Sequence, residues 1–204
     1  FDLERVHLVG HDWGVALVTA YAQAYPDKVH TVTTMAALPH NVLLARLEYD
    51  EAHRETFAYT SYFASANPVL LKVLGAKSQT WDSTYAPLLE AGLLPDAQAA
   101  QMKKDIGNPK RLDRLINWYR AHLVDFENIN AADYWPAKTA RLTAPSIFIY
   151  GAEDMVVTDP LVEDFKAISD NLRVLELPVV VLRPHFEERE RVIAEIRGLI
   201  SSAS

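Results

Sequence analysis

The strongest constraint on the fold is a series of short apolar segments that alternate with helical patterns. Each segment is rich in β-branched or aromatic residues and too short for a buried helix, so it predicts a strand. The predicted strands cover residues 6–9, 31–37, 146–150 and 173–177. Helical patterns cover residues 14–25, 158–168 and 187–200. Strands that alternate with helices build a parallel sheet, so the chain is predicted to be an α/β protein.

The helix boundaries and the first strand carry further information. Pro26 ends the first helix, and Thr158 followed by Pro160 marks the start of another. The last helix is predicted to bury a face that includes Val192, Ile196 and Leu199. A first strand this apolar is expected to have neighbours on both sides. Because the chain starts at Phe1, we expect the N-terminal part of the core to be missing.

The strand signal disappears over the middle of the chain. Residues 40–136 are rich in Ala, Leu, Tyr, Glu and Lys, and their helical runs are broken by prolines. We therefore expect a helical cap or lid at 40–136, inserted into a core formed by residues 1–39 and 137–204.

Composition excludes several classes of function. The chain has no cysteine, so disulfides, thiolate metal sites and cysteine nucleophiles are excluded. A net charge of −7 argues against nucleic-acid binding, and no apolar segment reaches the length of a membrane span. The histidines lack metal-ligand spacing, so no metal site is expected. A cytoplasmic location is expected, but a signal ahead of Phe1 stays open.

Three titratable residues follow predicted strands, at the sheet edge where α/β proteins bind ligands. Asp12 follows the first strand between Gly10 and Gly14, Asp154 follows the third, and His185 lies between the fourth strand and the last helix. Each has a simpler interpretation: Asp12 and Asp154 as helix caps, and His185 as a surface residue. Glu153 is the alternative to Asp154.

An aspartate at such a turn has a specific chemistry. Its carboxylate attacks an electrophilic carbon without a base to activate it, which leaves an alkyl ester on the protein. A histidine then activates water to hydrolyse the ester, and a second carboxylate orients the imidazole. The two glycines are expected to permit a tight turn, and the N–H groups of the turn to hold an oxyanion. Asp12, His185 and Asp154 fit these three roles.

Four motifs resemble the epoxide hydrolase and haloalkane dehalogenase branch of the α/β-hydrolases. They are GHDWG at 10–14, YTSYF at 59–63, NWYR at 117–120 and GAED at 151–154. The resemblance implies an α/β-hydrolase fold with a lid, and an epoxide hydrolase that needs no cofactor or metal. It assigns Asp12 as nucleophile, His185 as general base and Asp154 as its partner. Tyr59 and Tyr119 would hold the epoxide oxygen. His11 and Trp13 would line the pocket or oxyanion hole.

The implied substrates are water and a small apolar epoxide, and a homodimer stays open. A phenol stabilises the charge on an opening epoxide oxygen. Tyr119 shares a predicted apolar helix face with Leu112, Leu115, Ile116 and Leu123. The tyrosines are otherwise core residues of the lid. The sequence departs from the family where Pro184 replaces a glycine before His185, and it lacks the family's histidine-glycine-x-proline loop. A haloalkane dehalogenase and a non-catalytic binding protein are the alternative functions.

Overall fold

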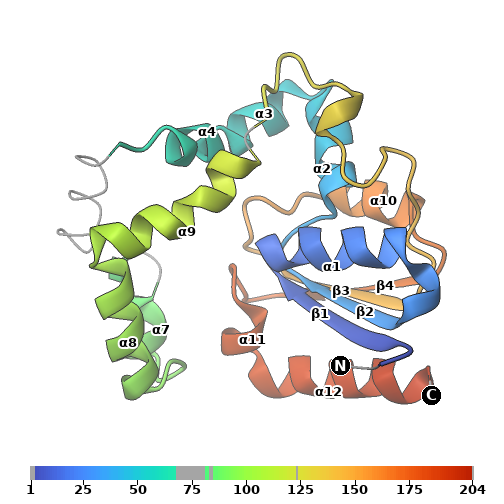
Figure 1. Cartoon of the computed structure of the whole chain (residues 1–204). Helices are drawn as coiled ribbons and strands as arrows, with labels where there is room; N and C mark the ends of the chain where they lie inside the picture. The colour runs from blue at the N-terminus through green and yellow to red at the C-terminus, as the bar shows by residue number, and fades with distance from the viewer. Residues whose placement is uncertain (1–2, 68–80, 83–84, 123, 204) are drawn as a thin grey trace. The chain divides into compact units, whose positions relative to one another are not determined.

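A computed structural model of the protein describes residues 3–67, 81–82, 85–122 and 124–203. Parallel strands form one sheet in the order β1-β2-β3-β4 (Figure 1). The strands are β1 (Val6–His11), β2 (Val29–Met35), β3 (Ser146–Gly151) and β4 (Leu172–Leu177). The predicted strands and their parallel arrangement are therefore confirmed.

β1 is an edge strand of this sheet. It lies at an edge of the sheet and pairs, within the described ranges, only with β2. Its side chains alternate in burial, and Val9 is 47% exposed. The central strand β3 is buried at all six positions. The apolar sequence of β1 indicates that it can be buried on both sides, but the strand order determines which neighbours it has.

Helices cover both faces of the sheet (Figure 1). α1 (Trp13–Ala24) packs against β1 and β2, and α12 (Arg189–Ser202) packs against β2 and β3 from the opposite side. α12 buries Val192 and Leu199 in a cluster that also contains strand residues such as Ile147, and Ile196 packs against that cluster. The predicted apolar face of the last helix is confirmed.

The other elements of the core connect the strands. They are η1 (Pro26–Lys28), α2 (His40–Leu47), α3 (Glu51–Phe57), η2 (Ala131–Asp133), α10 (Asp159–Ala167) and α11 (Pro184–Glu187). α1 ends before Pro26, as predicted. Pro184 occupies the first position of α11, where a proline fits because that N–H needs no helical partner. The histidine segment is therefore a short helix and a separate element from α12.

The chain divides into two compact units. The first contains residues 1–55 and 125–204, and the second contains residues 56–124. The second unit lies within the range that was predicted to be a lid. α2 and residues 125–136, which that range also included, belong to the first unit. The role of the second unit as a lid stays a prediction.

The second unit is helical throughout its described secondary structure. Its helices are α4 (Tyr59–Ala64), α7 (Ala86–Glu90), α8 (Asp96–Ile106) and α9 (Pro109–Ala121). Asn108 caps α9 by accepting the N–H groups of Lys110 and Arg111, and Pro109 supplies the first helical residue. Leu112 and Ile116 of α9 pack with Ala66. Within the described ranges, no helix has both the length and the apolar character required to cross a membrane.

Candidate active site

Asp12 lies between β1 and α1 in a backbone conformation that residues with side chains rarely adopt. Its φ is 53° and its ψ is −128°. Such a conformation costs about 1–3 kcal/mol and persists only where the surrounding structure enforces it. Here the Asp12 N–H donates to the Met35 carbonyl at 3.1 Å, and the Asp12 carbonyl accepts from the Val15 N–H at 2.8 Å. Asp12 therefore lies on a sharp strand-to-helix elbow.

The Asp12 side chain differs from an ordinary helix cap. A capping carboxylate usually accepts from the second or third N–H of the helix, and its backbone is extended. The Oδ1 atom of Asp12 accepts instead from the first helical N–H, that of Trp13, at 2.6 Å. The backbone conformation and the hydrogen bond both favour a presented carboxylate over a cap.

The two glycines of the elbow have unequal roles. A Cβ on Gly10 would overlap the carbonyl of Gly14 and the side chain of Val18, so β1 approaches α1 closely at this point. A Cβ on Gly14 would meet no atom of the described residues within 4 Å, apart from its own helix backbone and chain neighbours. The close approach of β1 and α1 therefore depends on Gly10, whereas the space around Gly14 would also admit a side chain.

Asp154 lies in the turn that follows β3 and is 7% exposed. Its Oδ1 accepts from the Val156 N–H at 3.0 Å. Burial raises the pKa of Asp154 to about 6, because an ionised carboxylate is disfavoured away from water, and the negative charge of Asp12 acts in the same direction. The neighbouring Glu153 is exposed, so burial favours Asp154 as the carboxylate of the site.

His185 is the second residue of α11. Burial lowers its pKa to about 4, and the nearby charges of His11 and Arg183 add to the effect. The rings of His185 and His11 meet edge-on with centroids 4.5 Å apart. The His185 imidazole is therefore neutral at pH 7, as a general base must be.

One buried atom of Asp154 and one of His185 lack hydrogen-bond partners in the described part of the chain and are chemically suited to each other. Asp154 Oδ2 and His185 Nδ1 are both buried, and neither has a hydrogen-bond partner among the described residues. A carboxylate oxygen accepts a hydrogen bond and an imidazole N–H donates one, so each atom can satisfy the other. Buried polar atoms without partners cost stability, which makes this pair a feature that calls for a functional explanation.

Two side chains hold the segment that carries His185. The His11 ring bonds to the Leu182 carbonyl at 2.9 Å, and because a carbonyl only accepts, His11 Nε2 is the donor. The Glu187 carboxylate accepts the N–H groups of Val181 at 3.0 Å and Arg183 at 2.7 Å. His11, predicted as a pocket residue, therefore also connects the elbow to the histidine segment.

The second unit brings Tyr59 and Tyr119 together. Tyr59 begins α4 and Tyr119 lies near the end of α9, with ring centroids 6.3 Å apart and planes at 71°. Phe63 contacts both rings, at 5.9 and 5.1 Å. Two residues separated by 60 positions in the sequence thus form one aromatic cluster within this unit.

Arg120 of the NWYR motif fixes α9 to the end of α4. Its guanidinium donates to the carbonyls of Ala64 at 3.3 Å and Ala66 at 2.9 Å, and it forms an ion pair with Asp113 at 2.8 Å. The ion pair with Asp113 lies within α9, whereas the bonds to Ala64 and Ala66 hold the two tyrosine-bearing helices side by side. Leu112 and Ile116 of the predicted apolar face are buried, whereas Leu115 is 54% exposed, and Leu123 lies outside the described residues.

The described ranges contain no group of three or more His, Cys, Asp or Glu side chains arranged to hold a metal ion.

A family model provides the decisive comparison. The model of the alpha/beta hydrolase fold matches residues 1–179 of the 204-residue chain. The chain belongs to the alpha/beta hydrolase fold family.

Solved structures of the same fold include several epoxide hydrolases. A variant of an epoxide hydrolase from Bacillus megaterium aligns with a TM-score of 0.76 at 16% identity, over 97% of this chain and 70% of that one. Another variant of the Bacillus enzyme, in complex with its product (R)-3-[1]naphthyloxy-propane-1,2-diol, aligns with a TM-score of 0.78 at 17% identity over the same shares. A structure reported with novel epoxide hydrolases from metagenomes of hot environments aligns at 0.76 and 24% identity, over 97% and 68%. No curated protein sequence matches the chain significantly.

In an alpha/beta hydrolase the nucleophile lies on an elbow after a strand, and acid and histidine follow later in the chain. Asp12, Asp154 and His185 have this order and these positions. Sequence reasoning missed Glu187, Arg120 and the tightly packed Gly151, where a Cβ would overlap the Val180 carbonyl. Arg120 had a usable signal, because it lies directly after Tyr119 in NWYR. Glu187 and Gly151 act through contacts with residues whose proximity depends on the fold.

Proposed function

We propose that the protein hydrolyses an epoxide to a vicinal diol through an alkyl ester on Asp12. The observation that carries the proposal is the unpartnered pair Asp154 Oδ2 and His185 Nδ1, in an alpha/beta hydrolase whose elbow presents an aspartate. A carboxylate attacks an epoxide carbon directly and thus needs a histidine only for the later hydrolysis of the ester. A serine at the elbow would need the histidine for both steps.

In the first step Asp12 Oδ2 attacks an epoxide carbon, and the bond between that carbon and the ring oxygen breaks. The negative charge that develops on this oxygen takes a proton from Tyr59 or Tyr119, and the other phenol donates a hydrogen bond. The aromatic cluster of the two tyrosines supports these roles, because their rings lie within one group on two helices.

In the second step His185 removes a proton from water, and the water oxygen attacks the carboxyl carbon of the Asp12 ester. Negative charge then develops on Asp12 Oδ1, the atom that already accepts the Trp13 N–H. Collapse of this intermediate releases the diol, whose leaving oxygen takes the proton from His185. The carboxylic acid left on Asp12 returns a proton to the tyrosine. Trp13 thereby acts as an oxyanion donor through its backbone.

The charge states fit this sequence at neutral pH. The lowered pKa of His185, about 4, keeps the ring able to accept a proton. The pKa of Asp154, about 6, leaves its carboxylate ionised and able to stabilise the imidazolium. Turnover should decline as the pH falls from 6 towards 4, because Asp154 and then His185 become protonated.

A single turnover in ¹⁸O-labelled water tests the ester. With enzyme in excess over styrene oxide, the first diol should carry no label, because its new oxygen comes from Asp12, and the protein should gain one ¹⁸O. His185→Gln should retain the alkyl ester as added mass on the protein. Asp154→Asn should slow hydrolysis of the ester, whereas Glu153→Gln is the matched control and should not. Label in the first diol and none in the protein would exclude an ester on Asp12.

The same assay separates the alternative functions. Tyr119→Phe should slow epoxide opening by about 10²–10³-fold, the usual effect of removing one oxyanion donor. A haloalkane dehalogenase would tolerate this substitution and release halide. A binding protein would form no adduct with any epoxide.

A further inference from the structure

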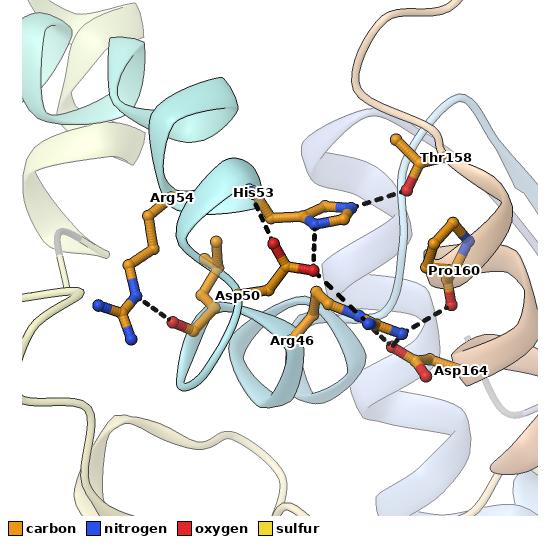
Figure 2. Close-up of polar contacts among 8 residues, drawn as sticks. Arg46, Asp50, His53, Arg54, Thr158, Pro160 and Asp164 are labelled. Carbon is orange, nitrogen blue, oxygen red and sulfur yellow. Dashed lines mark hydrogen bonds and ion pairs between the residues drawn. The ribbon is translucent and has the colours of Figure 1, made fainter.

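A second buried polar network lies apart from the candidate triad, where α2 and α3 meet the start of α10 (Figure 2). His53 of α3 is 8% exposed. Its Nδ1 lies 2.8 Å from Asp50 Oδ2, and its Nε2 lies 2.8 Å from Thr158 Oγ1. The ring is therefore hydrogen-bonded to the Thr158 hydroxyl, and its Nδ1 lies within ion-pair distance of Asp50 without a hydrogen bond to it.

Asp50 contacts both the backbone and the ring of His53. Its Oδ1 accepts the His53 N–H at 3.1 Å, and its Oδ2 is the atom that lies beside the ring. The hydrogen bond to His53 lowers the pKa of Asp50, which keeps this carboxylate ionised. His53 is therefore held by Asp50 and bonded through its ring to Thr158.

The hydroxyl of Thr158 does not cap the helix that Thr158 precedes. Thr158 is the N-cap residue of α10, but its side chain makes no capping hydrogen bond. A threonine cap contributes about 1 kcal/mol to a helix. The sequence predicted Thr158 as a conventional cap, whereas the structure uses its hydroxyl to bind His53 across 105 positions of sequence.

Arg46 ties α2 to the first turns of α10. It binds Asp164 through Nε at 2.8 Å and through a terminal nitrogen at 2.7 Å, and it donates to the Pro160 carbonyl at 3.2 Å. The same guanidinium lies 3.6 Å from Asp50. The start of α10 is therefore held by α2 as well as by His53.

α3 is itself fixed within the first unit. Arg54 donates to the carbonyls of Leu47 and Glu48, each at 2.6 Å, and it forms an ion pair with Glu127 at 3.2 Å. The bond from Arg54 to the end of α2 is visible in Figure 2. His53 is therefore carried by a firmly attached helix.

Thr158 is only four residues from Asp154, and the segment between them is a tight turn. The Val156 N–H donates to Asp154 Oδ1, and the Val157 N–H donates to the Asp154 carbonyl at 3.4 Å. Val157 is buried. A displacement of Thr158 would therefore move the Asp154 carboxylate. Its Oδ1 is bonded only within this turn, to the Val156 N–H, and its Oδ2 has no hydrogen-bond partner among the described residues.

We propose that His53 is a positioning residue for Asp154: through Thr158 it holds the turn 154–158 so that Asp154 Oδ2 is directed at His185. The kinetic consequence rests on the proposed function, in which Asp154 acts only when the ester is hydrolysed. Loss of the brace should slow the second step and leave the attack by Asp12 unchanged.

Thr158→Val tests the brace, because it removes the hydroxyl and retains the shape of the side chain. Thr158→Ser keeps the hydroxyl, and Ser169→Ala is the control, since it removes a hydroxyl bonded to the Phe165 carbonyl near the other end of α10. Rapid-quench mass spectrometry with styrene oxide measures ester formation and decay separately. Thr158→Val should slow decay by about tenfold to a hundredfold, the cost of a misplacement near 1 Å, with formation unchanged. Both other variants should behave as the unsubstituted protein does.

Equal slowing of both steps, or unchanged decay, would overturn the proposal. Amide hydrogen exchange supplies a readout that needs no substrate. Exchange in residues 154–158 should rise in Thr158→Val and stay unchanged in Ser169→Ala, while exchange in α1 is the same in both. If the protein opens no epoxide, the proposed function fails and the exchange experiment still decides on the brace. Unchanged exchange in the turn would refute the brace itself.

Discussion

Replacement of Asp154 by asparagine should stabilise the protein while it slows turnover. Burial raises the pKa of this carboxyl from its ordinary 3.8 to about 6. The folded protein therefore binds the Asp154 proton more tightly than the unfolded chain does, and ionisation above pH 6 costs folding free energy. Asparagine is similar in shape and has no charge, so Asp154→Asn should remove this cost.

The size of the effect follows from the two pKa values. One unit corresponds to about 1.4 kcal/mol, so a carboxyl with pKa values of 3.8 and 6 destabilises the fold by about 3 kcal/mol at pH 8. At pH 5 the folded form is already largely protonated, and the cost falls to about 1.6 kcal/mol. Below pH 3.8 it vanishes. For a chain of this length, about 3 kcal/mol corresponds to a rise in melting temperature of about 6–12 °C.

Urea unfolding of the unsubstituted protein, Asp154→Asn and Glu153→Gln at pH 8 and pH 5 measures the effect. Asp154→Asn should gain stability at both pH values, about twice as much at pH 8. Glu153→Gln removes an exposed charge one residue away and should differ little from the unsubstituted protein. If Asp154→Asn is no more stable than the unsubstituted protein at pH 8, or gains equally at both pH values, burial does not raise the pKa of Asp154.

Three further substitutions test the packing around the site and within the second unit. Gly10→Ala should lose about 1–3 kcal/mol of unfolding free energy, because its Cβ would meet the Gly14 carbonyl, whereas Gly14→Ala should be neutral or stabilising. Calorimetry compares the two variants. Equal losses of stability would contradict the finding that a Cβ has space at Gly14 but not at Gly10. Arg120→Lys should slow epoxide opening, because a lysine cannot make the forked hydrogen bonds to Ala64 and Ala66, at the end of α4, that hold Tyr119 beside Tyr59. Unchanged opening rates in the rapid-quench assay would show that Arg120 does not position the tyrosines.

Much of the fold could be predicted from local patterns. The strands observed at 6–11 and 146–151 were predicted at 6–9 and 146–150, because a buried strand needs a continuous apolar run, which is a property of a few adjacent residues. The order of Asp12, Asp154 and His185 at strand ends could be predicted for the same reason. The order of the strands in the sheet could not, because strand neighbours depend on long-range pairing that no local pattern records.

The site shows the same division. Residue types alone indicate what chemistry Asp12 and His185 can perform, since a carboxylate and an imidazole have fixed reactivity. Folding decides how each polar group is satisfied, because hydrogen-bond partners lie far apart in the chain. Thus the Thr158 hydroxyl binds His53 and not its own helix, and Tyr59 meets Tyr119 on a neighbouring helix. The unpaired atoms of Asp154 and His185 likewise emerge only when burial removes them from water.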